Sequence, residues 1–432
     1  MIRRLPVSLL LTLLMPLAGC QVSASTTDIA GRDATLAPEA GQATGAADHE
    51  AGEPVARSVR QDFAAWVADF RRQALGEGIN AVTLAAAFDD VRYLPRIIEL
   101  DRAQPEFTRQ VWDYLDTAVS AARVEQGRAQ LAEHQASIQA ASRRYGVPAE
   151  ILVAIWGIES NYGSNFGNFS TIDALATLGY DGRRPDFARS ELLAALRILQ
   201  RGDIDREHMR GSWAGAMGHT QFLPSSFEDH ARDADGDGRR DIWGSIADVM
   251  ASTANYLADA GWRQGEPWGS EVRLPEGFDY AQTELDVRRS SQAWLEQGVR
   301  GVRGAQLPAL DQASVIAPAG AHGPAFLVGH NFRVIMRYNA STSYALAVAL
   351  LSERLAGEPG LVGDWPRQEP ALSRSQVKRL QQLLNAHGFD VGAPDGVIGP
   401  NTRRGLREYQ RSLGQTPDGF ATVELLERLA AD

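Results

Sequence analysis

Cysteine, lysine and long hydrophobic runs are scarce in this chain of 432 residues. Cysteine occurs once, which excludes an intrachain disulfide and a four-cysteine zinc site. Lysine also occurs once, and the formal net charge of -11 argues against the basic face of a general nucleic-acid binder. The composition, 44% hydrophobic and 22% charged, is that of a folded protein, and the length predicts more than one folded unit.

The N-terminal segment has the layout of a secretory signal. Arg3-Arg4 precedes an apolar stretch, Leu5 to Ala18, that is shorter than the ~20 residues needed to cross a bilayer. Its end, Leu17-Ala18-Gly19-Cys20, resembles the lipobox of bacterial lipoproteins, in which the signal is cleaved before an acylated cysteine. The resemblance implies a signal peptide over 1–19 and a lipid anchor at Cys20. Because Gln21 is not the aspartate of the inner-membrane retention signal, it implies the periplasmic face of the outer membrane. A plain signal peptide is the alternative.

Residues 20–57 are predicted to form a flexible linker. They are mostly Ala, Gly, Thr, Asp and Glu without an aromatic residue, so they cannot bury enough surface to offset their ordering entropy. Beyond them, Phe63, Trp66, Val67 and Phe70 recur at helical spacing and predict a helix with one buried face. Similar periodicity predicts helix through 112–119 and 131–138.

A hydrophobic helix that ends in a carboxylate is the most informative segment. Pro148 marks its start, because proline suits the first helical turn and the residue before it resists helix. Residues Ile151–Ile158 are apolar on every side, which indicates burial all round, and Glu159 follows at the C-terminal end. Apolar surroundings and the negative pole of the helix dipole both raise the pKa of a carboxyl group. Glu159 is therefore a candidate general acid, with a solvated helix end as the alternative.

Three stretches around this helix carry a resemblance to a known family. They are Ala154-Ile-Trp-Gly-Ile-Glu-Ser-Asn-Tyr-Gly163, Asp173-Ala-Leu-Ala-Thr-Leu178 and Gly211-Ser-Trp-Ala-Gly-Ala-Met-Gly-His-Thr-Gln-Phe-Leu-Pro-Ser-Ser226. With them, the predicted catalytic domain, 58–356, resembles the membrane-bound lytic murein transglycosylase B family, glycoside hydrolase family 103. The resemblance implies a mainly α (α+β), lysozyme-like domain with a small β-containing part. It also implies a lyase that cleaves the MurNAc-GlcNAc β-1,4 bond of peptidoglycan without water and leaves a 1,6-anhydromuramic acid end.

The same resemblance implies roles for individual side chains. Glu159 would protonate the glycosidic oxygen and then take the proton of the muramic acid 6-hydroxyl. An ordinary glycosidase pairs two carboxylates across the bond, and no second acid lies close to Glu159 in sequence. The residues implied to bind the glycan strand are Ser212, Gln221, Tyr338, Asn339, Tyr114, Tyr256 and Tyr344, with Arg183 and Arg184 for lactyl or peptide carboxylates. For each tyrosine, a core ring with a satisfied hydroxyl is the alternative.

An acidic loop, Asp233-Ala-Asp235-Gly-Asp237-Gly238-Arg239, has the spacing of an EF-hand calcium loop. It places carboxylates at positions one, three and five, glycine at six and a backbone carbonyl at seven. The twelfth position is Gly244, where a bidentate glutamate is expected, so the last ligand must come from elsewhere. Alignment with the resembling family points to Asp248. The prediction is a structural calcium ion and no organic cofactor, with an empty Asp-rich turn as the alternative.

The C-terminal residues, 372–432, are predicted to form a separate small domain behind a Pro- and Gly-containing linker, 357–371. Ser373 is expected to cap a helix that Gly388 ends. Pro394-Asp-Gly396 and Pro417-Asp-Gly419 repeat 23 residues apart, each as a turn followed by a helix. The segment resembles the three-helix peptidoglycan-binding domain of cell-wall hydrolases, with a generic helical bundle as the alternative.

Three functions remain compatible with these patterns. The leading one is an outer-membrane lipoprotein that acts as a lytic transglycosylase on peptidoglycan glycan strands, with other cell-wall enzymes as partners and no nucleic acid. The same acid acting with water would make a hydrolytic muramidase. A lipid anchor and a binding domain alone would make a non-catalytic peptidoglycan tether.

Overall fold

The computed structural model describes residues 52–103 and 110–432, with side chains from Gln61 onward apart from the same gap. Cys20, the predicted signal 1–19 and most of the predicted linker 20–57 lie outside the described residues. The chain divides into two compact units, one ending at Gln73 and one beginning at Ala74, which are described separately. No helix of the described part combines the length and the apolar character needed to span a membrane.

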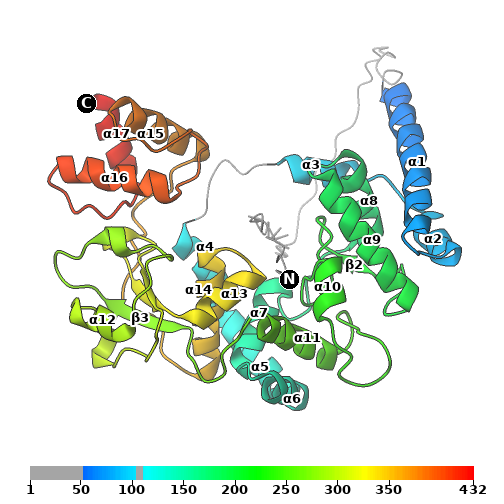
Figure 1. Ribbon diagram of the computed structural model, residues 1–432, viewed down its shortest axis with the longest axis horizontal. Helices are drawn as coiled ribbons and strands as arrows, with labels where there is room; N and C mark the ends of the chain where they lie inside the picture. The colour runs from blue at the N-terminus through cyan, green and yellow to red at the C-terminus, as the bar shows by residue number, and fades with distance from the viewer. Residues whose placement is uncertain (1–51, 104–109) are drawn as a thin grey trace, which may run out of the picture. The chain divides into compact units, whose positions relative to one another are not determined.

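Helices make up most of the regular structure (Figure 1). The α-helices are α1 Gly52–Gly76, α2 Ala81–Phe88, α3 Pro95–Arg102, α4 Val111–Ala118, α5 Ala121–Glu133, α6 Gln135–Tyr145, α7 Ala149–Ser160, α8 Thr171–Asp181, α9 Pro185–Arg201, α10 Pro224–His230, α11 Ile246–Asp259, α12 Ser291–Glu296, α13 His330–Tyr338, α14 Thr342–Ala356, α15 Arg374–Ala386, α16 Pro400–Ser412 and α17 Val423–Ala431. The strands are β1 Phe169–Ser170, β2 Arg210–Gly211, β3 Gly269–Arg273, β4 Arg300–Gly301, β5 Ser314–Ile316 and β6 Ala325–Val328. Short 3-10 helices are η1 Tyr280–Gln282, η2 Val302–Gly304 and η3 Gly320–His322.

Helix α1 carries the aromatic stripe that the sequence predicted. Phe63, Val67 and Phe70 are buried, and the Trp66 ring stacks on the Phe63 and Phe70 rings at centroid distances of 6.1 and 5.3 Å. The helix begins at Gly52, so the last residues of the predicted linker, 52–57, are helical. The composition of the linker hid this start, although Pro54 is a residue that the first helical turn accepts.

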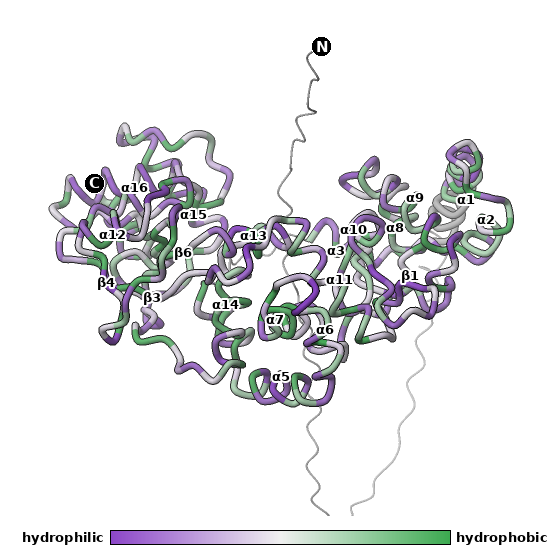
Figure 2. Tube along the Cα trace, turned by 60° about the horizontal axis from the view of Figure 1, so that its bottom comes forward, coloured by the Kyte–Doolittle hydropathy of each residue, from purple (hydrophilic) through white to green (hydrophobic). Residues whose placement is uncertain are grey.

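Helix α7 is the buried centre of the unit that begins at Ala74. Its N-cap is Pro148, as the sequence predicted, and every side chain from Ile151 to Ile158 is buried. Helices α5, α6, α11 and α14 pack against it, and Figure 2 labels it in the hydropathy colouring. Apolar neighbours surround α7 on all sides. Packing against them, and not the adjoining loops, therefore fixes the position of its C-terminal end.

The helix predicted over 131–138 is interrupted. Helix α5 ends at Glu133 and α6 begins at Gln135, because His134 has non-helical angles of φ -107° and ψ 25°. Hydrophobic periodicity did not reveal the break, since the apolar positions on both sides keep their helical spacing. The helix predicted over 112–119 corresponds to α4, which ends one residue earlier.

Two small antiparallel sheets complete the mainly helical unit, in agreement with the predicted fold class. Strands β1 and β2 pair Phe169 with Gly211 and Ser170 with Arg210. The second sheet has the order β4-β3-β6-β5, all antiparallel. Its core contains Trp294, Val315 and Leu327. This is the small β-containing part that the family resemblance implied.

The C-terminal helices α15, α16 and α17 enclose a hydrophobic core of their own. Leu380, Leu384, Leu406 and Leu429 are fully buried in it. Ser373 caps α15 through a reciprocal capping box with Gln376, which confirms the predicted start. The helix ends at Ala386, with Gly388 two residues later in a left-handed conformation, φ +86°. The three-helix architecture is therefore confirmed.

Candidate active site

The carboxyl group of Glu159 is held in the last turn of α7, where the buried helix reaches its solvent edge. Glu159 itself is partly buried, and Ser160 beside it is fully buried. Tyr344, on α14, is 1% exposed and donates a hydrogen bond from its hydroxyl to Oε1 of Glu159 at 2.6 Å. The carboxyl group therefore has a fixed position at the boundary between the core and the solvent.

Burial changes the acidity of this carboxyl group. It raises the pKa of Glu159 to about 7, against the opposing effect of the hydrogen bond from Tyr344, which favours the charged form. The site at the C-terminal end of α7 also disfavours negative charge, since the helix dipole is negative there. With a pKa of about 7, both the protonated and the ionised forms are populated near neutral pH. Glu159 can thus donate a proton and, once ionised, accept one.

Tyrosine rings form a cluster beside Glu159. The Tyr338 ring stacks parallel to that of Tyr344 at 6.5 Å, and the Tyr256 ring lies 4.8 Å from that of Tyr338. The hydroxyls of Tyr338 and Tyr256 donate to backbone carbonyls. Tyr338 donates to Thr220 at 2.7 Å, and Tyr256 donates to Arg337 at 2.6 Å. Burial, followed by the charge of Glu159, raises the pKa of Tyr338 and Tyr344, so both stay neutral donors.

Tyr114 and Asn339 lie at the edges of this cluster. Tyr114 is on α4 and is close enough to Tyr344 to contribute to the raised pKa of that tyrosine, after burial and nearer charges. Asn339 caps the C-terminal end of α13 directly after Tyr338, with its backbone N–H bonded to the carbonyl of Ile335. The four sequence-predicted tyrosines therefore converge on the Glu159 region from α4, α11, α13 and α14, and Asn339 directly follows one of them.

The segment from Gly211 to Phe222 forms a tight loop that carries Ser212 and Gln221. The Ser212 hydroxyl accepts a hydrogen bond from the N–H of Ala216 at 3.1 Å and so stabilises the turn in which it lies. Gln221 has φ +50°, a backbone conformation that is strained for a residue other than glycine. Its amide nitrogen donates to the carbonyl oxygens of Phe166 at 3.0 Å and Gly218 at 2.9 Å. Both predicted sugar contacts therefore also shape the loop.

His219 is a residue of this loop that sequence reasoning missed. Its ring stacks on Trp156 of α7 at 5.8 Å, and its Nδ1 accepts the indole N–H at 3.2 Å. Its carbonyl accepts from the hydroxyl of Ser160 at 2.9 Å. Burial lowers the pKa of His219 to about 4, so the ring is neutral at pH 7. His219 thus ties the loop to the end of α7, a long-range contact without a local sequence signal.

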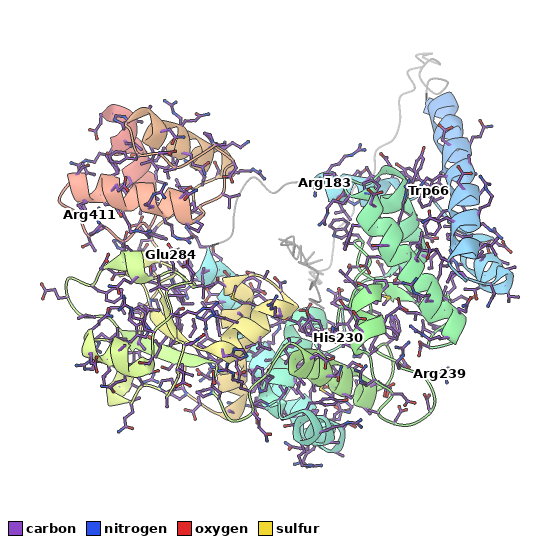
Figure 3. All side chains as sticks on the ribbon, in the orientation of Figure 1. Trp66, Arg183, His230, Arg239, Glu284 and Arg411 are labelled. Atoms are coloured by element: carbon purple, nitrogen blue, oxygen red, sulfur yellow. The ribbon has the colours of Figure 1, made fainter. Side chains whose placement is uncertain are left out.

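The two predicted arginines have partners away from the tyrosine cluster. Arg183 lies beside α3 (Figure 3), where its Nε is 3.4 Å from Oδ1 of Asp101. Arg184 stands over the Phe187 ring at 5.2 Å. Among the described residues, neither arginine forms a hydrogen bond or ion pair with Glu159 or the tyrosines. Their role in binding lactyl or peptide carboxylates of the substrate stays a prediction.

The acidic loop lies between α10 and α11 and gathers three carboxylates. Oxygens of Asp233, Asp235 and Asp248 all lie within 4.8 Å of one another. Asp248 is fully buried, and its two oxygens accept backbone N–H groups from Ala234 at 2.7 Å and Asp241 at 2.8 Å. Burial first, and then the charge of Asp235, raises the pKa of Asp248. Crowded carboxylates of this kind suit a hard divalent cation with oxygen ligands.

The other loop residues shape the backbone. Asp237 accepts the N–H of Arg239 at 2.8 Å and lies outside the group of three carboxylates, while the side chain of Arg239 is exposed (Figure 3). Asp241, at loop position nine, was not singled out from the sequence; its Oδ1 accepts the N–H groups of Trp243 and Gly244 at 2.8 and 2.9 Å. The carbonyl of Ile242 accepts the N–H of His219 at 2.9 Å. The acidic loop therefore supports the loop that carries Ser212 and Gln221.

Comparison with known families identifies both folded parts. The model of the transglycosylase SLT domain matches residues 62–353, more than half of the chain. The chain belongs to the transglycosylase SLT domain family. Residues 373–429 match the model of a putative peptidoglycan binding domain. These matches confirm the resemblances inferred from the sequence for the two domains.

Some relatives of this chain in the transglycosylase SLT domain family have crystal structures. The chain is 53% identical to SltB3 from Pseudomonas aeruginosa in complex with NAG-anhNAM-pentapeptide, with a TM-score of 0.83 over 85% of this chain and 99% of that one. It is 28% identical to the Escherichia coli lytic transglycosylase Slt35 in complex with calcium, with a TM-score of 0.57 over 67% and 92%. It is 34% identical to membrane-bound lytic murein transglycosylase B of Escherichia coli K12 over 52% of this chain, and the match spans 61% of that protein's length.

The raised pKa of Glu159 predicts a pH-dependent stability difference between the wild type and Glu159→Gln. Between the ordinary pKa of 4.5 and about 7, the folded state binds more protons at this site than the unfolded state, so stability falls as pH rises. The glutamine variant lacks this loss. Urea unfolding should show the wild type losing up to about 3 kcal/mol relative to the variant from about pH 4 to about pH 8. Parallel stability curves for the two proteins would contradict a raised pKa.

Proposed function

We propose that this chain is a lytic transglycosylase that cleaves the MurNAc-GlcNAc bond of peptidoglycan and leaves a 1,6-anhydromuramic acid end. The single observation that carries the proposal is Glu159, a carboxyl group with a pKa of about 7 that is hydrogen-bonded to the buried Tyr344. Family membership supports it, as does the similarity to SltB3, whose complex contains an anhydro sugar.

In the proposed reaction Glu159 acts twice. As an acid, its carboxyl proton goes to the glycosidic oxygen, the bond from C1 of MurNAc to that oxygen breaks, and GlcNAc leaves with a free 4-hydroxyl. As a base, the resulting carboxylate takes the proton of the MurNAc 6-hydroxyl, and that oxygen bonds to C1. The sum uses no water and returns Glu159 to its protonated form. A pKa near 7 suits both steps, because neither form of the carboxyl group is too scarce at neutral pH.

The surroundings of Glu159 favour one carboxylate over two. Among the side chains that the structure describes, the partner of the Glu159 carboxyl group is the hydroxyl of Tyr344, and burial and this hydrogen bond are the causes of the shift in its pKa. Most hydrolytic glycosidases use a second carboxylate about 5 to 9.5 Å away as nucleophile or to activate water. An internal hydroxyl of the substrate removes that need.

The remaining predicted residues are proposed to hold the glycan. Tyr114, Tyr256 and Tyr338 are partly exposed and are proposed to offer ring faces to sugars, while Ser212, Gln221 and Asn339 supply polar contacts at the cleaved bond. Tyr344 is 1% exposed and is a core ring with a satisfied hydroxyl, the alternative left open by the sequence. Tyr344 also orients the carboxyl group of Glu159 through its hydrogen bond. Arg183 and Arg184 are proposed to bind lactyl or peptide carboxylates of the substrate.

Digestion of purified sacculi tests the proposed reaction. The wild type should release muropeptides with anhydromuramic acid ends, which are lighter by one water than hydrolysis products. Glu159→Gln should lower the rate by a factor of about 100 to 10,000, because the amide cannot donate and recover the proton. Mass spectrometry of the released fragments measures both the rate and the product.

A matched control is Glu358→Gln, an exposed glutamate in the linker that follows the catalytic domain, which should digest sacculi like the wild type. Reducing-end muramic acid in place of the anhydro form would assign a hydrolytic muramidase. No release by the wild type would assign a non-catalytic tether.

Calcium is proposed to bind in the acidic loop. Asp233, Asp235 and Asp248 bring carboxylate oxygens together, and the two positive charges of the ion would offset the repulsion among them and fix the loop that supports His219. Asp237 and the carbonyl of Arg239, predicted from the spacing, would complete the oxygen ligands. A crystal structure of the relative Slt35 in complex with calcium supports the assignment. The role is structural, since the ion takes no part in the proton transfers.

Removal of calcium should therefore lower the melting temperature. A ligand present at a hundred times its dissociation constant stabilises the folded state by about 2.7 kcal/mol. Differential scanning calorimetry with added calcium and with excess chelator measures the shift. Asp233→Asn should melt at the lower temperature and respond to neither addition. Equal melting temperatures for the wild type in calcium and in chelator would exclude an ion that stabilises the loop.

The proposed location is the periplasmic face of the outer membrane, with a lipid on Cys20. The sequence around Cys20 and the name of the relative, membrane-bound lytic murein transglycosylase B, support it. The partners proposed are peptidoglycan glycan strands, the outer-membrane lipid and other cell-wall enzymes. The C-terminal domain would keep the enzyme concentrated on its insoluble substrate.

A further inference from the structure

The linker between the catalytic domain and the C-terminal helices is fastened to the four-stranded sheet. The carboxylate of Glu271, on β3, accepts the backbone N–H groups of Val362 and Gly363 at 2.8 and 2.7 Å. The ring of Trp365 lies 6.3 Å from that of Phe326 on β6. The proline and glycine content predicted a linker, and these contacts give this part of it a defined position on the sheet.

The same part of the linker also contacts α4. The ring of Trp365 lies 6.0 Å from that of Trp112, which is 3% exposed. Arg367 forms an ion pair with Asp116 and donates to its Oδ1 at 2.9 Å, a bond that lowers the pKa of Asp116. Trp112 and Asp116 are four residues apart in α4, so they lie on one face of the helix. The linker therefore covers that face.

The C-terminal domain reaches the same tryptophan. The ring of Phe420, ahead of α17, lies 6.4 Å from that of Trp112. Two polar contacts hold the domain in this place: Asp418 accepts a backbone N–H of η3 at 2.9 Å, and Arg403 donates to Glu284, labelled in Figure 3, at 2.6 Å. Trp112 thus has one aromatic neighbour from the linker and another from the C-terminal domain.

Helix α4 depends on such contacts because its own sequence stabilises it poorly. It has eight residues, and its N-cap, Gln110, makes no side-chain hydrogen bond to the first turn. Isolated helices shorter than about 12 residues are marginal in water, so packing must hold α4 in place. Helix α14 packs against it, and Trp365, Arg367 and Phe420 supply the contacts of its other face.

Tyr114 lies on the opposite face of α4 from Trp112 and Asp116. Two residues along an α-helix rotate the side chain by about 200°, so Tyr114 points away from both. Tyr114 is partly exposed, and it contributes, after burial and other groups, to the raised pKa of Tyr344. Helix α4 therefore has the tyrosine cluster on one face and the linker with the C-terminal domain on the other.

We propose that Trp365 and Phe420 are positioning residues for the transglycosylase: through Trp112 they hold α4 so that Tyr114 is in place for the glycan. The inference rests on the proposed function, in which Tyr114 offers its ring to a sugar. The C-terminal part of the chain thus acts on substrate binding at the active site, in addition to keeping the enzyme on its polymer. Its effect extends to substrates that are too short to reach the C-terminal domain.

Kinetics of the full chain on a soluble tetrasaccharide of alternating GlcNAc and MurNAc test the proposal. Trp365→Ala and Phe420→Ala should each raise KM about three- to tenfold and leave kcat within about twofold, because the acid itself is unchanged. Trp365→Phe keeps an aromatic ring between α4 and β6 and should return KM to within about twofold of the wild type. A fall in kcat with an unchanged KM would overturn the proposal.

Combination with Tyr114→Ala tests the route of the effect. In that background Trp365→Ala should raise KM little further, because the contact that Trp365 supports is already lost. Effects on KM that multiply would show that Trp365 acts independently of Tyr114, which contradicts the proposal.

The matched control for Phe420→Ala is Phe389→Ala. Both rings are partly buried and belong to the C-terminal domain, but the Phe389 ring packs on its core, 5.8 Å from the ring of Tyr409. Phe389→Ala should keep the KM of the wild type. An equal rise in KM for the two variants would mean that loss of stability in the domain is the cause, and the positioning role would fall.

Hydrogen exchange followed by mass spectrometry reports on α4 without any reaction. In Trp365→Ala and Phe420→Ala the amides of 111–118 should exchange faster than in the wild type, while those of α7 stay equally protected. Unchanged exchange of α4 in both variants would overturn the proposal, and so would an equal increase in α4 and α7, which marks general destabilisation. Failure of the proposed function is seen elsewhere, as a wild type that releases no anhydro product, and leaves this exchange result intact.

Discussion

Desolvation of one carboxyl group is the constraint on which the rest of the active site depends. Water would stabilise the charged form of Glu159 and return its pKa to the ordinary value, so the protein keeps the group at the end of a helix that is buried on every side. The hydrogen bond from Tyr344 opposes the shift but fixes the direction of the carboxyl group. A single acid can then supply a proton at neutral pH and take one back.

This arrangement explains why so much of the domain converges on α7. Helix α14 supplies the hydroxyl of Tyr344, and the loop from Gly211 to Phe222 is fastened to α7 through His219 and Trp156. That loop is in turn supported by the acidic loop, where the carbonyl of Ile242 accepts the N–H of His219. These contacts connect the acidic loop to α7, the helix that carries Glu159, without any direct contact between the acidic loop and Glu159. The C-terminal domain contacts the catalytic domain through the second of its two repeats, where Arg403 binds Glu284 and Asp418 accepts the N–H of Ala321.

Local signals in the sequence were enough to predict much of this structure. The apolar run ahead of Glu159, the proline at its start, the cap at Ser373 and the repeated Asp-Gly turns each depend on neighbours in the chain, and each is present as predicted. Contacts across the chain were not predictable in this way. Tyr344 lies 185 residues from Glu159, and the docking of Asp418 on Ala321 distinguishes two repeats that look alike in sequence. The break at His134 was missed because it leaves the hydrophobic pattern intact.

The most direct test of the account is the titration of Glu159 itself. Carbon-13 NMR of glutamate carboxyl groups, with Glu159→Gln to assign the signal, follows this one side chain through its protonation. The account predicts a midpoint of about 7. A midpoint at the ordinary value of 4.5 would mean that the pocket is wet and the carboxyl group ionised at neutral pH, and it would contradict the proposed role of Glu159 as the acid.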